Sequence, residues 1–364
     1  MDLLWITNIA TPYTVPVWHE LGKLTDLHVA CLARTEANRQ WQTSLEQVPS
    51  TVLGARPIQL GAERTLYLPA FGMLRLFRQR PDVVVLDGWE SPAFWQARLL
   101  ASLYGTRVVQ SYWSTAATHR FSSGPIAAFR SWFFRSADSV ITPGPAATEA
   151  VEAMGVPPQR ITTGFGTVDV ARFSRGARAA RARLSQRSGH HFLYVGQLIA
   201  RKNVCTLLHA FAAMRGIADT LTIVGTGPLE HDLQKLTGEL GLRDRVSFEG
   251  HKDVDELIES YAAANTLVLP STEEVWGLVV NEALSAGLSV VVSDRCGVSR
   301  SVAEMPAVYV TEPVESTLVS ALDQARREAR RPDESHPITM LTPSALASHL
   351  IKTFAGARQH AKAS

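Results

Sequence analysis

The sequence has few cysteines, no long apolar run and almost no net charge. Its three cysteines, Cys31, Cys205 and Cys296, lie far apart, which excludes a disulfide framework or a cysteine metal cluster and indicates a reducing cytoplasm. No uninterrupted apolar run approaches the ~18 residues of a membrane-spanning helix, and the start of the chain is typical of a strand, not of a signal peptide. The 36 basic residues nearly balance the 34 acidic ones, which disfavours nucleic-acid binding.

The sequence does contain a regular alternation of short apolar runs and longer helical segments. This alternation predicts an α/β fold with parallel sheets covered by helices. At 364 residues the chain exceeds the ~250–300 at which one core usually divides, so two domains are expected. The expected strands are residues 3–7, 27–32, 83–87, 107–112, 139–142 and 160–163 in the first half, and 191–196, 221–225, 246–250, 266–270, 289–293 and 308–310 in the second.

An arginine-rich stretch from Phe173 to His190 separates the two sets of strands. It has few apolar residues, so we expect a linker with an exposed helical turn. The predicted organisation is an N-terminal domain over residues 1–174, a linker over 175–190, a C-terminal domain over 191–340 and a last helix within 341–364.

The most informative stretch is residues 271–287, which holds Glu274 and Glu282 with seven residues between them. The apolar run before it predicts a buried strand that ends in a loop, and a helix is expected to begin near Trp276. Unpaired backbone N–H groups at the start of such a helix suit a diphosphate. Gly277 has no Cβ and lets a phosphate approach the backbone, while Glu282 reaches past it toward the two hydroxyls of a ribose.

This block resembles the E-x7-E signature of glycosyltransferase family 4, whose members are retaining enzymes that use nucleotide sugars. The elements Pro-Ser, Glu, aromatic-Gly-Leu and Glu-Ala follow one another in the order of the family. The similarity extends to a strand, glycine and basic loop over 191–203, a Gly-x-Gly-Pro turn within 221–228 and a strand over 245–250. It continues more loosely in residues 137–142 and 167–173.

The resemblance implies a GT-B fold, with two facing Rossmann-like domains of parallel sheets and a C-terminal crossover helix that packs back towards the N-terminal domain. It implies a donor site on the second domain, with Lys202 and Glu274 as catalytic residues. Lys202 and Arg201 would bind the diphosphate, Glu274 would face the sugar and Glu282 the ribose. The other donor-binding positions are Gly196, Gln197, Gly225, Gly227, Trp276, Gly277, Leu278 and Val279. No metal ion and no cofactor is expected, because cations and helix dipoles replace them.

Three stretches depart from the family pattern. Gln197 stands where an arginine is usual, so one expected cation is missing and Arg201 is the candidate to replace it. The first strand is followed by a loop with two prolines instead of a glycine-rich loop. A histidine that many members place after the fourth strand is absent, and His119, six residues beyond Trp113, is no evident substitute.

A nicotinamide enzyme is a rival interpretation of the turn at Gly225 and Gly227. With Glu249 at the end of the next strand, the turn suggests a dinucleotide fingerprint. Glu230 occupies the place of the third glycine, where close helix packing needs a small residue, so this interpretation is disfavoured.

Two apparent metal motifs also have simpler explanations. Asp253 and Asp255 stand where a helix should begin, and acidic residues are the usual choice in a first turn. His190 and His191 lie at a strand entry without nearby metal-ligating partners, which favours a structural role.

The acceptor is expected on the first domain, because open α/β sheets bind ligands at the carboxyl ends of their strands. The loops after Thr7, Asp87 and Tyr112 lie at such ends. The acceptor-side candidates are Tyr13, Trp89, Trp113 and His119.

A basic face on the first domain is a further feature of the sequence. Residues 51–135 hold ten arginines and no lysine. Some of these arginines flank apolar side chains and suit a peripheral contact with anionic headgroups at the inner membrane face. Amphipathic helices that pack on their own sheet give the same pattern. The residues concerned are Arg75, Arg78 and Arg80 beside Leu74, Leu76 and Phe77, and Arg130 and Arg135 beside residues 132–134.

Taken together, the sequence predicts a cytoplasmic hexosyltransferase that moves a sugar, with retention, from a UDP- or GDP-type donor. The acceptor is a hydroxyl of a glycan, a glycolipid or a small metabolite. Two alternatives on the same fold are a nucleotide-sugar epimerase and a non-catalytic protein that binds nucleotide sugars.

Overall fold

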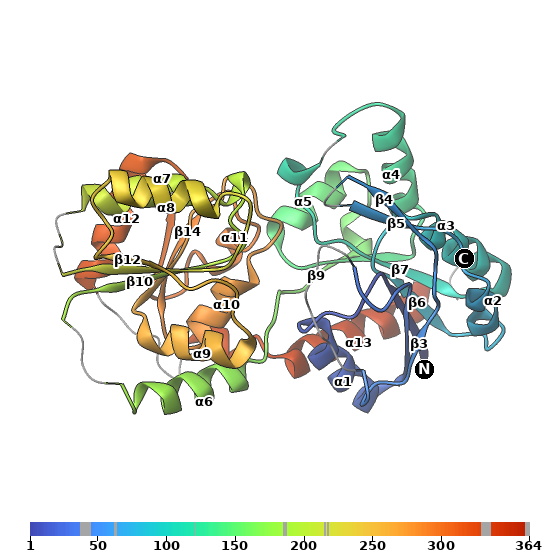
Figure 1. Cartoon of the computed structure of the whole chain (residues 1–364). Helices are drawn as coiled ribbons and strands as arrows, with labels where there is room; N and C mark the ends of the chain where they lie inside the picture. Colours follow the sequence, from blue (N-terminus) through green and yellow to red (C-terminus); the bar gives the residue numbers. More distant parts are fainter. Residues whose placement is uncertain are drawn as a thin grey trace. The chain divides into compact units, whose positions relative to one another are not determined.

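The computed structural model describes residues 1–36, 45–61, 64–119, 121–184, 188–214, 216, 218–328 and 336–360, and its elements are labelled in Figure 1. The chain divides into two compact units. Unit 1 comprises Met1–Phe165 and Pro343–Ser364, and unit 2 comprises Gly166–Thr342.

Unit 1 contains a seven-stranded parallel sheet with the order β3-β2-β1-β6-β7-β8-β9. Its strands are β1 (Asp2–Thr7), β2 (Asp26–Cys31), β3 (Ser50–Val52), β6 (Val83–Leu86), β7 (Arg107–Ser111), β8 (Ser139–Thr142) and β9 (Ile161–Thr163). A separate antiparallel hairpin joins β4 (Pro57–Leu60) to β5 (Arg64–Tyr67). The helices are α1 (Thr14–Leu24), α2 (Gly72–Phe77), α3 (Pro92–Tyr104), α4 (Pro125–Arg135), α5 (Pro145–Ala153) and α13 (Pro343–His360), with short 3-10 turns η1 (Ala116–Thr118) and η2 (Pro158–Arg160).

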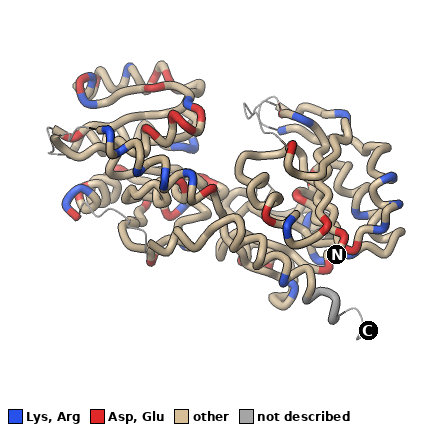
Figure 2. Tube along the Cα trace, turned by 90° about the horizontal axis from the view of Figure 1, so that it is seen from below, with Lys and Arg blue, Asp and Glu red and all other residues tan. Residues whose placement is uncertain are grey.

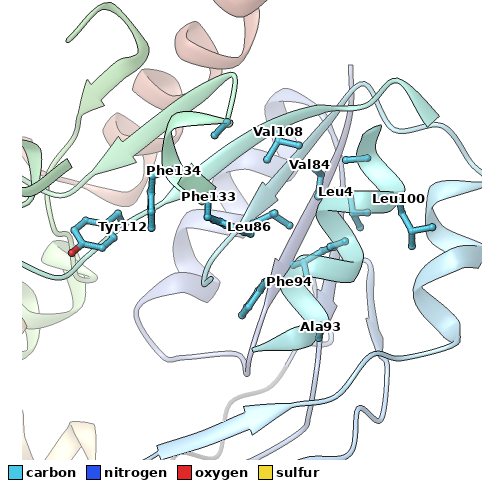
Figure 3. Packing of buried hydrophobic residues seen from close by; sticks show 14 of the residues in the cluster. Leu4, Val84, Leu86, Ala93, Phe94, Leu100, Val108, Tyr112, Phe133 and Phe134 are labelled. Carbon is cyan, nitrogen blue, oxygen red and sulfur yellow. The ribbon is translucent and has the colours of Figure 1, made fainter. Parts of the chain in front are cut away.

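Helices cover both faces of this sheet. Successive side chains of a strand point to opposite faces, so the strands contribute to two separate cores. Leu4 and Leu86 belong to a core with Phe94, Phe133 and Phe134, which come from α3 and α4 (Figure 3). The neighbouring strand residues belong to a second core with α1 and α13, made by Leu3, Trp5, Val83, Val85, Trp18, Leu21, Leu350 and Phe354 among others. The last helix of the chain is thus part of unit 1.

Unit 2 contains a six-stranded parallel sheet with the order β12-β11-β10-β13-β14-β15. Its strands are β10 (His191–Val195), β11 (Thr220–Val224), β12 (Val246–Phe248), β13 (Thr266–Leu269), β14 (Ser289–Ser293) and β15 (Val308–Thr311). Its helices are α6 (Val170–Arg181), α7 (Val204–Ala213), α8 (Glu230–Glu239), α9 (Val254–Ala263), α10 (Leu278–Ser285), α11 (Ser299–Val302) and α12 (Glu315–Glu328), with η3 (Ala200–Lys202) and η4 (Pro337–Met340). Helices α7, α8 and α12 cover one face of the sheet, and α6, α9 and α10 cover the other (Figure 1).

Residues 175–181 differ from the predicted linker. They belong to α6, which packs on α9 and α10 within unit 2. The physical reason is a buried stripe at helical spacing, Val170, Phe173, Ala177 and Ala180, which the many arginines obscured. Residues 185–187 of the predicted linker lie outside the described residues.

Basic and acidic residues are interspersed on each unit (Figure 2). In the described ranges no helix is long and apolar enough to cross a membrane. The same ranges contain no group of three or more His, Cys, Asp or Glu side chains arranged to hold a metal ion.

Candidate functional site

The two residues predicted to be catalytic lie together in unit 2. The ammonium of Lys202, at the end of η3, forms an ion pair with the carboxylate of Glu274, in the loop between β13 and α10. Their side chains are only 12% and 14% exposed. The pair lies where the chain leaves β10 and β13, which are neighbours in the sheet, so it occupies the ligand-binding edge of a parallel α/β unit.

Backbone hydrogen bonds hold the two loops that carry this pair. The amide of Thr272 donates to the carbonyl of Arg201 at 2.9 Å, and the side-chain amide of Asn203 donates to the carbonyl of Pro270 at 3.2 Å. On the other side, the amide of Gly297 donates to the carbonyl of Glu274 at 3.0 Å. The position of Lys202 relative to Glu274 is therefore fixed by the backbone as well as by the ion pair.

The glycines of the predicted Gly-x-Gly-Pro turn, Gly225 and Gly227, pack against the loop after β10. A Cβ at Gly225 would lie 1.9 Å from the carbonyl oxygen of Gly196, and one at Gly227 would lie 2.4 Å from that of Leu198. Gly225 also has a φ of 134°. Both glycines therefore allow two loops to touch, and a side chain at either position would clash with the backbone of the other loop.

The loop after β10 presents Gln197 and Arg201 differently. Gln197 is exposed, and its carbonyl accepts a hydrogen bond from the hydroxyl of Tyr194 at 2.9 Å. Arg201 is half-buried, one residue before Lys202. Whether Arg201 replaces the cation missing at Gln197 stays a prediction.

Helix α10 begins two residues later than the sequence predicts. Its first residue is Leu278, and Gly277 is its N-cap with a φ of 101°. Trp276 therefore lies before the helix; its side chain is buried, and its indole N–H donates to Asn281 at 3.2 Å. The first-turn amides therefore start at Leu278 and Val279.

The carboxylate expected to bind a ribose is deeply buried. Glu282 is 3% exposed, and its Oε2 accepts a hydrogen bond from the hydroxyl of Tyr261 on α9 at 2.6 Å. Tyr261 packs edge-on against Phe173 of α6. Tyr261 is a site residue that the sequence did not single out, although it opens the stretch 261–265 that precedes β13.

Two neutral groups surround the ion pair. Burial, followed by the negative charge of Glu274, raises the pKa of the Cys296 thiol well above its ordinary value. Burial and the same carboxylate raise the pKa of Tyr194. Both side chains remain protonated, so neither adds a charge beside the ion pair.

In unit 1 a cavity of about 480 Å³ opens at the carboxyl ends of β6 and β7. Two acceptor-side candidates, Trp89 and His119, line it. The hydroxyl of Tyr112 is hydrogen-bonded to Nε2 of His119, and Figure 3 shows the oxygen of Tyr112 pointing away from the core that its ring joins. Burial and the positive charge of Arg130 lower the pKa of His119 to about 4, so its imidazole is neutral at pH 7.

The other two acceptor-side candidates do not line this cavity. Trp113 is half-buried and its indole N–H donates to Ser111 at 3.1 Å. Tyr13 is the N-cap residue of α1. Conversely, the cavity contains Arg130, for which the sequence left open a membrane contact or packing on its own sheet, and which is buried here.

Asp87 is a titratable residue near the ends of the central strands of unit 1. Burial raises the pKa of its carboxyl group, and hydrogen bonds from Ser111 and Thr7 oppose that rise. The hydroxyl of Thr7 donates to Asp87 at 3.1 Å. The sequence placed this residue only as the start of an acceptor loop.

The sequence matches two known protein families. The profile described as "Glycosyl transferases group 1" matches residues 180–331, and the "Glycosyl transferase 4-like domain" matches residues 10–163. Together they cover both units.

Individual relatives match part of the chain. A glycogen synthase of Mycobacterium tuberculosis is 30% identical over 234 residues, which are 61% of this chain and 54% of the relative. A GDP-mannose-dependent alpha-mannosyltransferase of the same organism is 33% identical over 245 residues, 64% of this chain and 61% of the relative. The chain thus spans between half and two thirds of the length of these relatives.

Solved structures of other proteins resemble this fold, and HepE from Anabaena is an example. HepE from Anabaena, crystallised in complex with UDP, superposes with a TM-score of 0.72, covering 100% of both chains at 16% sequence identity. At 16% identity this likeness shows a shared fold alone.

Proposed function

Because this chain belongs to the GT4-type glycosyltransferases and has the predicted GT-B fold class, we propose that it transfers a hexosyl group from a nucleoside diphosphate sugar to an acceptor hydroxyl. The donor is of the UDP or GDP type and the acceptor is a glycan, a glycolipid or a small metabolite. The observation that carries the proposal is the buried ion pair of Lys202 and Glu274.

On this proposal Lys202 stabilises the leaving nucleoside diphosphate. The ammonium is preorganised by η3 and needs only to turn from Glu274 to the phosphate when the donor binds. Arg201 adds a second cation, and the amides from Gly277 to Val279 face the outer phosphate. These fixed positive groups neutralise the leaving group, so we propose that the reaction needs no metal ion and no cofactor.

Glu274 and Glu282 have separate tasks on this proposal. Once Lys202 binds phosphate, the Glu274 carboxylate orients the hydroxyls of the sugar and stabilises positive charge as the bond to phosphate breaks with retention. Glu282 binds the ribose, and the hydroxyl of Tyr261 holds its carboxylate in place.

A nucleotide-release assay in EDTA tests this function. UDP-, GDP-, ADP- and dTDP-sugars are offered with an acceptor extract, and we expect turnover of one nucleotide class. Lys202→Ala should lower turnover about thirty- to a thousandfold, a loss of about 2–4 kcal/mol of transition-state stabilisation. Lys235→Ala, an exposed lysine of α8 in the same unit, is the matched control and should leave turnover unchanged.

The other outcomes of this assay separate the alternatives. A donor sugar converted to its epimer without nucleotide release identifies an epimerase. Tight binding that both Lys202→Ala and Glu282→Ala weaken, without consumption of any donor, identifies a non-catalytic binding protein. No binding of any nucleotide sugar by folded protein contradicts the donor site itself.

We also propose a peripheral membrane contact through α2, α3 and α4 of unit 1. Phe129 and Trp132 of α4 are 53% and 50% exposed and stack with Trp95 of α3, and Phe71 before α2 is fully exposed. Leu76 and Phe77, by contrast, are buried in the core of the unit. Phe129→Ser with Trp132→Ser should abolish sedimentation with anionic vesicles, and unchanged sedimentation would contradict the contact.

A further inference from the structure

Arg130 of α4 is a buried cation without a counter-charge in the described part of the chain. The residue is 6% exposed, and its Nε has no hydrogen-bond partner. The guanidinium makes a cation–π contact with Trp89, whose ring centroid lies 5.9 Å from the guanidinium carbon. Because burial of an uncompensated charge is strongly unfavourable, such a group in a native protein requires an explanation.

The guanidinium of Arg130 lines the 480 Å³ cavity of unit 1. The cavity also contains Arg64 and Glu90, which form an ion pair at 3.1 Å with each other. Tyr112 and His119 are neutral at pH 7, because burial raises the pKa of the first and lowers that of the second. The charged groups in the lining are therefore two arginines and one glutamate, which leaves one uncompensated positive charge at Arg130.

The rest of the lining suits a sugar-sized molecule. The volume lies within the roughly 300–1,000 Å³ of ordinary small-molecule sites. Trp89 and Tyr112 contribute aromatic surface, and Phe121 and Ile126 contribute an apolar wall. Ser114, Thr118 and Tyr112 contribute hydroxyl groups to the lining.

We propose that this cavity binds the acceptor and that Arg130 pairs with an anionic oxyacid group, a carboxylate or a phosphate, on that acceptor. A guanidinium presents several N–H donors in a planar fork that matches both groups, and a cavity that excludes water strengthens the pairing. The proposal rests on the proposed function, since it names the class of acceptor for the same transfer.

Calorimetric titration of the full chain, without any nucleotide sugar, tests the proposal. The probes are glucose 6-phosphate and glucuronate, with glucose as their neutral match. We expect at least one anionic sugar to bind about tenfold or more tightly than glucose. The phosphate and carboxylate arms show which oxyacid group is preferred.

Three variants locate the binding. Arg130→Gln should abolish the preference for the charged sugar, while Arg135→Gln, an exposed arginine that ends the same helix, should keep it. Glu90→Gln removes the acidic group of the cavity and should strengthen anion binding. Circular dichroism will show whether Arg130→Gln folds. If it does not fold, the preference of the wild type for the charged sugar and the effect of Glu90→Gln test the proposal instead.

Equal affinity for glucose and its charged analogues, or no binding of either anion, would overturn the proposal. So would an unchanged preference in folded Arg130→Gln. Because the donor is absent, these results leave the proposal of glycosyl transfer intact, and failure of donor turnover likewise leaves the acid-binding cavity intact.

Discussion

At the scale of single residues, the least expected contact is the hydrogen bond from Tyr261 to Glu282. A buried carboxylate that loses a donor bears most of its desolvation penalty. Tyr261→Phe should therefore lower the free energy of unfolding by about 1–3 kcal/mol, as measured by urea denaturation. It should also weaken nucleotide-sugar binding, because the carboxylate of Glu282 loses the hydrogen bond from this hydroxyl.

Tyr309→Phe provides a matched control for this prediction. Its hydroxyl donates to Glu328 at 2.8 Å in the same unit, but this bond joins β15 to α12. We expect it to change stability without changing nucleotide affinity. If both variants weaken nucleotide binding equally, the holding role of Tyr261 is wrong.

His119 gives unit 1 a defined response to acid. Its pKa in the folded chain is about 4, below the ordinary value of 6.5, because the side chain is half-buried and lies near the positive charge of Arg130. Between these two values the unfolded chain binds the proton more readily, so the stability that this residue contributes is present above pH 6.5 and falls as the pH drops toward 4. Thermal melts of His119→Gln should therefore lose less stability than wild type over this interval, and parallel melting curves would contradict the low pKa.

At the scale of elements, the donor edge of unit 2 depends on loops that touch without side chains. An alanine at Gly225 would place its Cβ against the carbonyl of Gly196, at a φ that L-residues rarely adopt. We expect Gly225→Ala to cost at least about 1–3 kcal/mol of stability and to weaken nucleotide binding, because the loop that leads to Lys202 must move. Titration calorimetry measures the second effect.

Gly241→Ala is the control for strain alone. Gly241 also has a positive φ, of 68°, but a Cβ there would meet nothing within 4 Å. This variant should lose about 1–2 kcal/mol and keep its nucleotide affinity. Loss of affinity in both variants would mean that stability, and not loop position, controls binding.

Elements also show what could be read from the sequence. Most strands of the two large sheets were predicted, because parallel strands buried on both faces are continuous apolar runs. The edge strand β3 (Ser50–Val52) was missed, since it is only three residues long and mostly exposed. The hairpin of β4 and β5 was missed, since all four residues of β4 are exposed and give no apolar alternation. Helix α6 was hidden by its arginines, although its apolar residues repeat at helical spacing.

The same limits apply to the two sites. Glu274 and Glu282 belong to one local motif, and Lys202 belongs to another, 72 residues before Glu274. The pairing of β10 with β13 brings the loops of Lys202 and Glu274 together. The roles of Tyr261 and Arg130 depend on packing between different secondary-structure elements, and a sequence motif does not encode this packing. Arg130 shares the buried face of α4 with Ala127, Phe133 and Phe134, so the helical spacing of these residues indicated that it is buried. This signal was not used in the prediction, because arginine is rarely buried in proteins.

At the scale of the whole molecule, the C-terminal helix belongs to the unit that begins the chain. Phe354 of α13 is fully buried in one core with Trp18 and Leu21 of α1. A Phe→Ala change in such a core costs about 3–5 kcal/mol, through lost burial and the cavity left behind. Phe354→Ala should therefore destabilise unit 1, although the intervening sequence of unit 2 lies between the two parts of that core.

Hydrogen exchange measured by mass spectrometry can localise this loss, because local opening reports the stability of each cooperative unit. For Phe354→Ala we expect faster exchange in α1, β1 and β2, with unit 2 peptides and nucleotide binding unchanged. Leu322→Ala, which opens a cavity in the core of unit 2, should give the opposite pattern. Equal loss of protection in both units after either change would show that they unfold in one cooperative transition. The donor and acceptor sites would then be lost together, with the same free energy of unfolding.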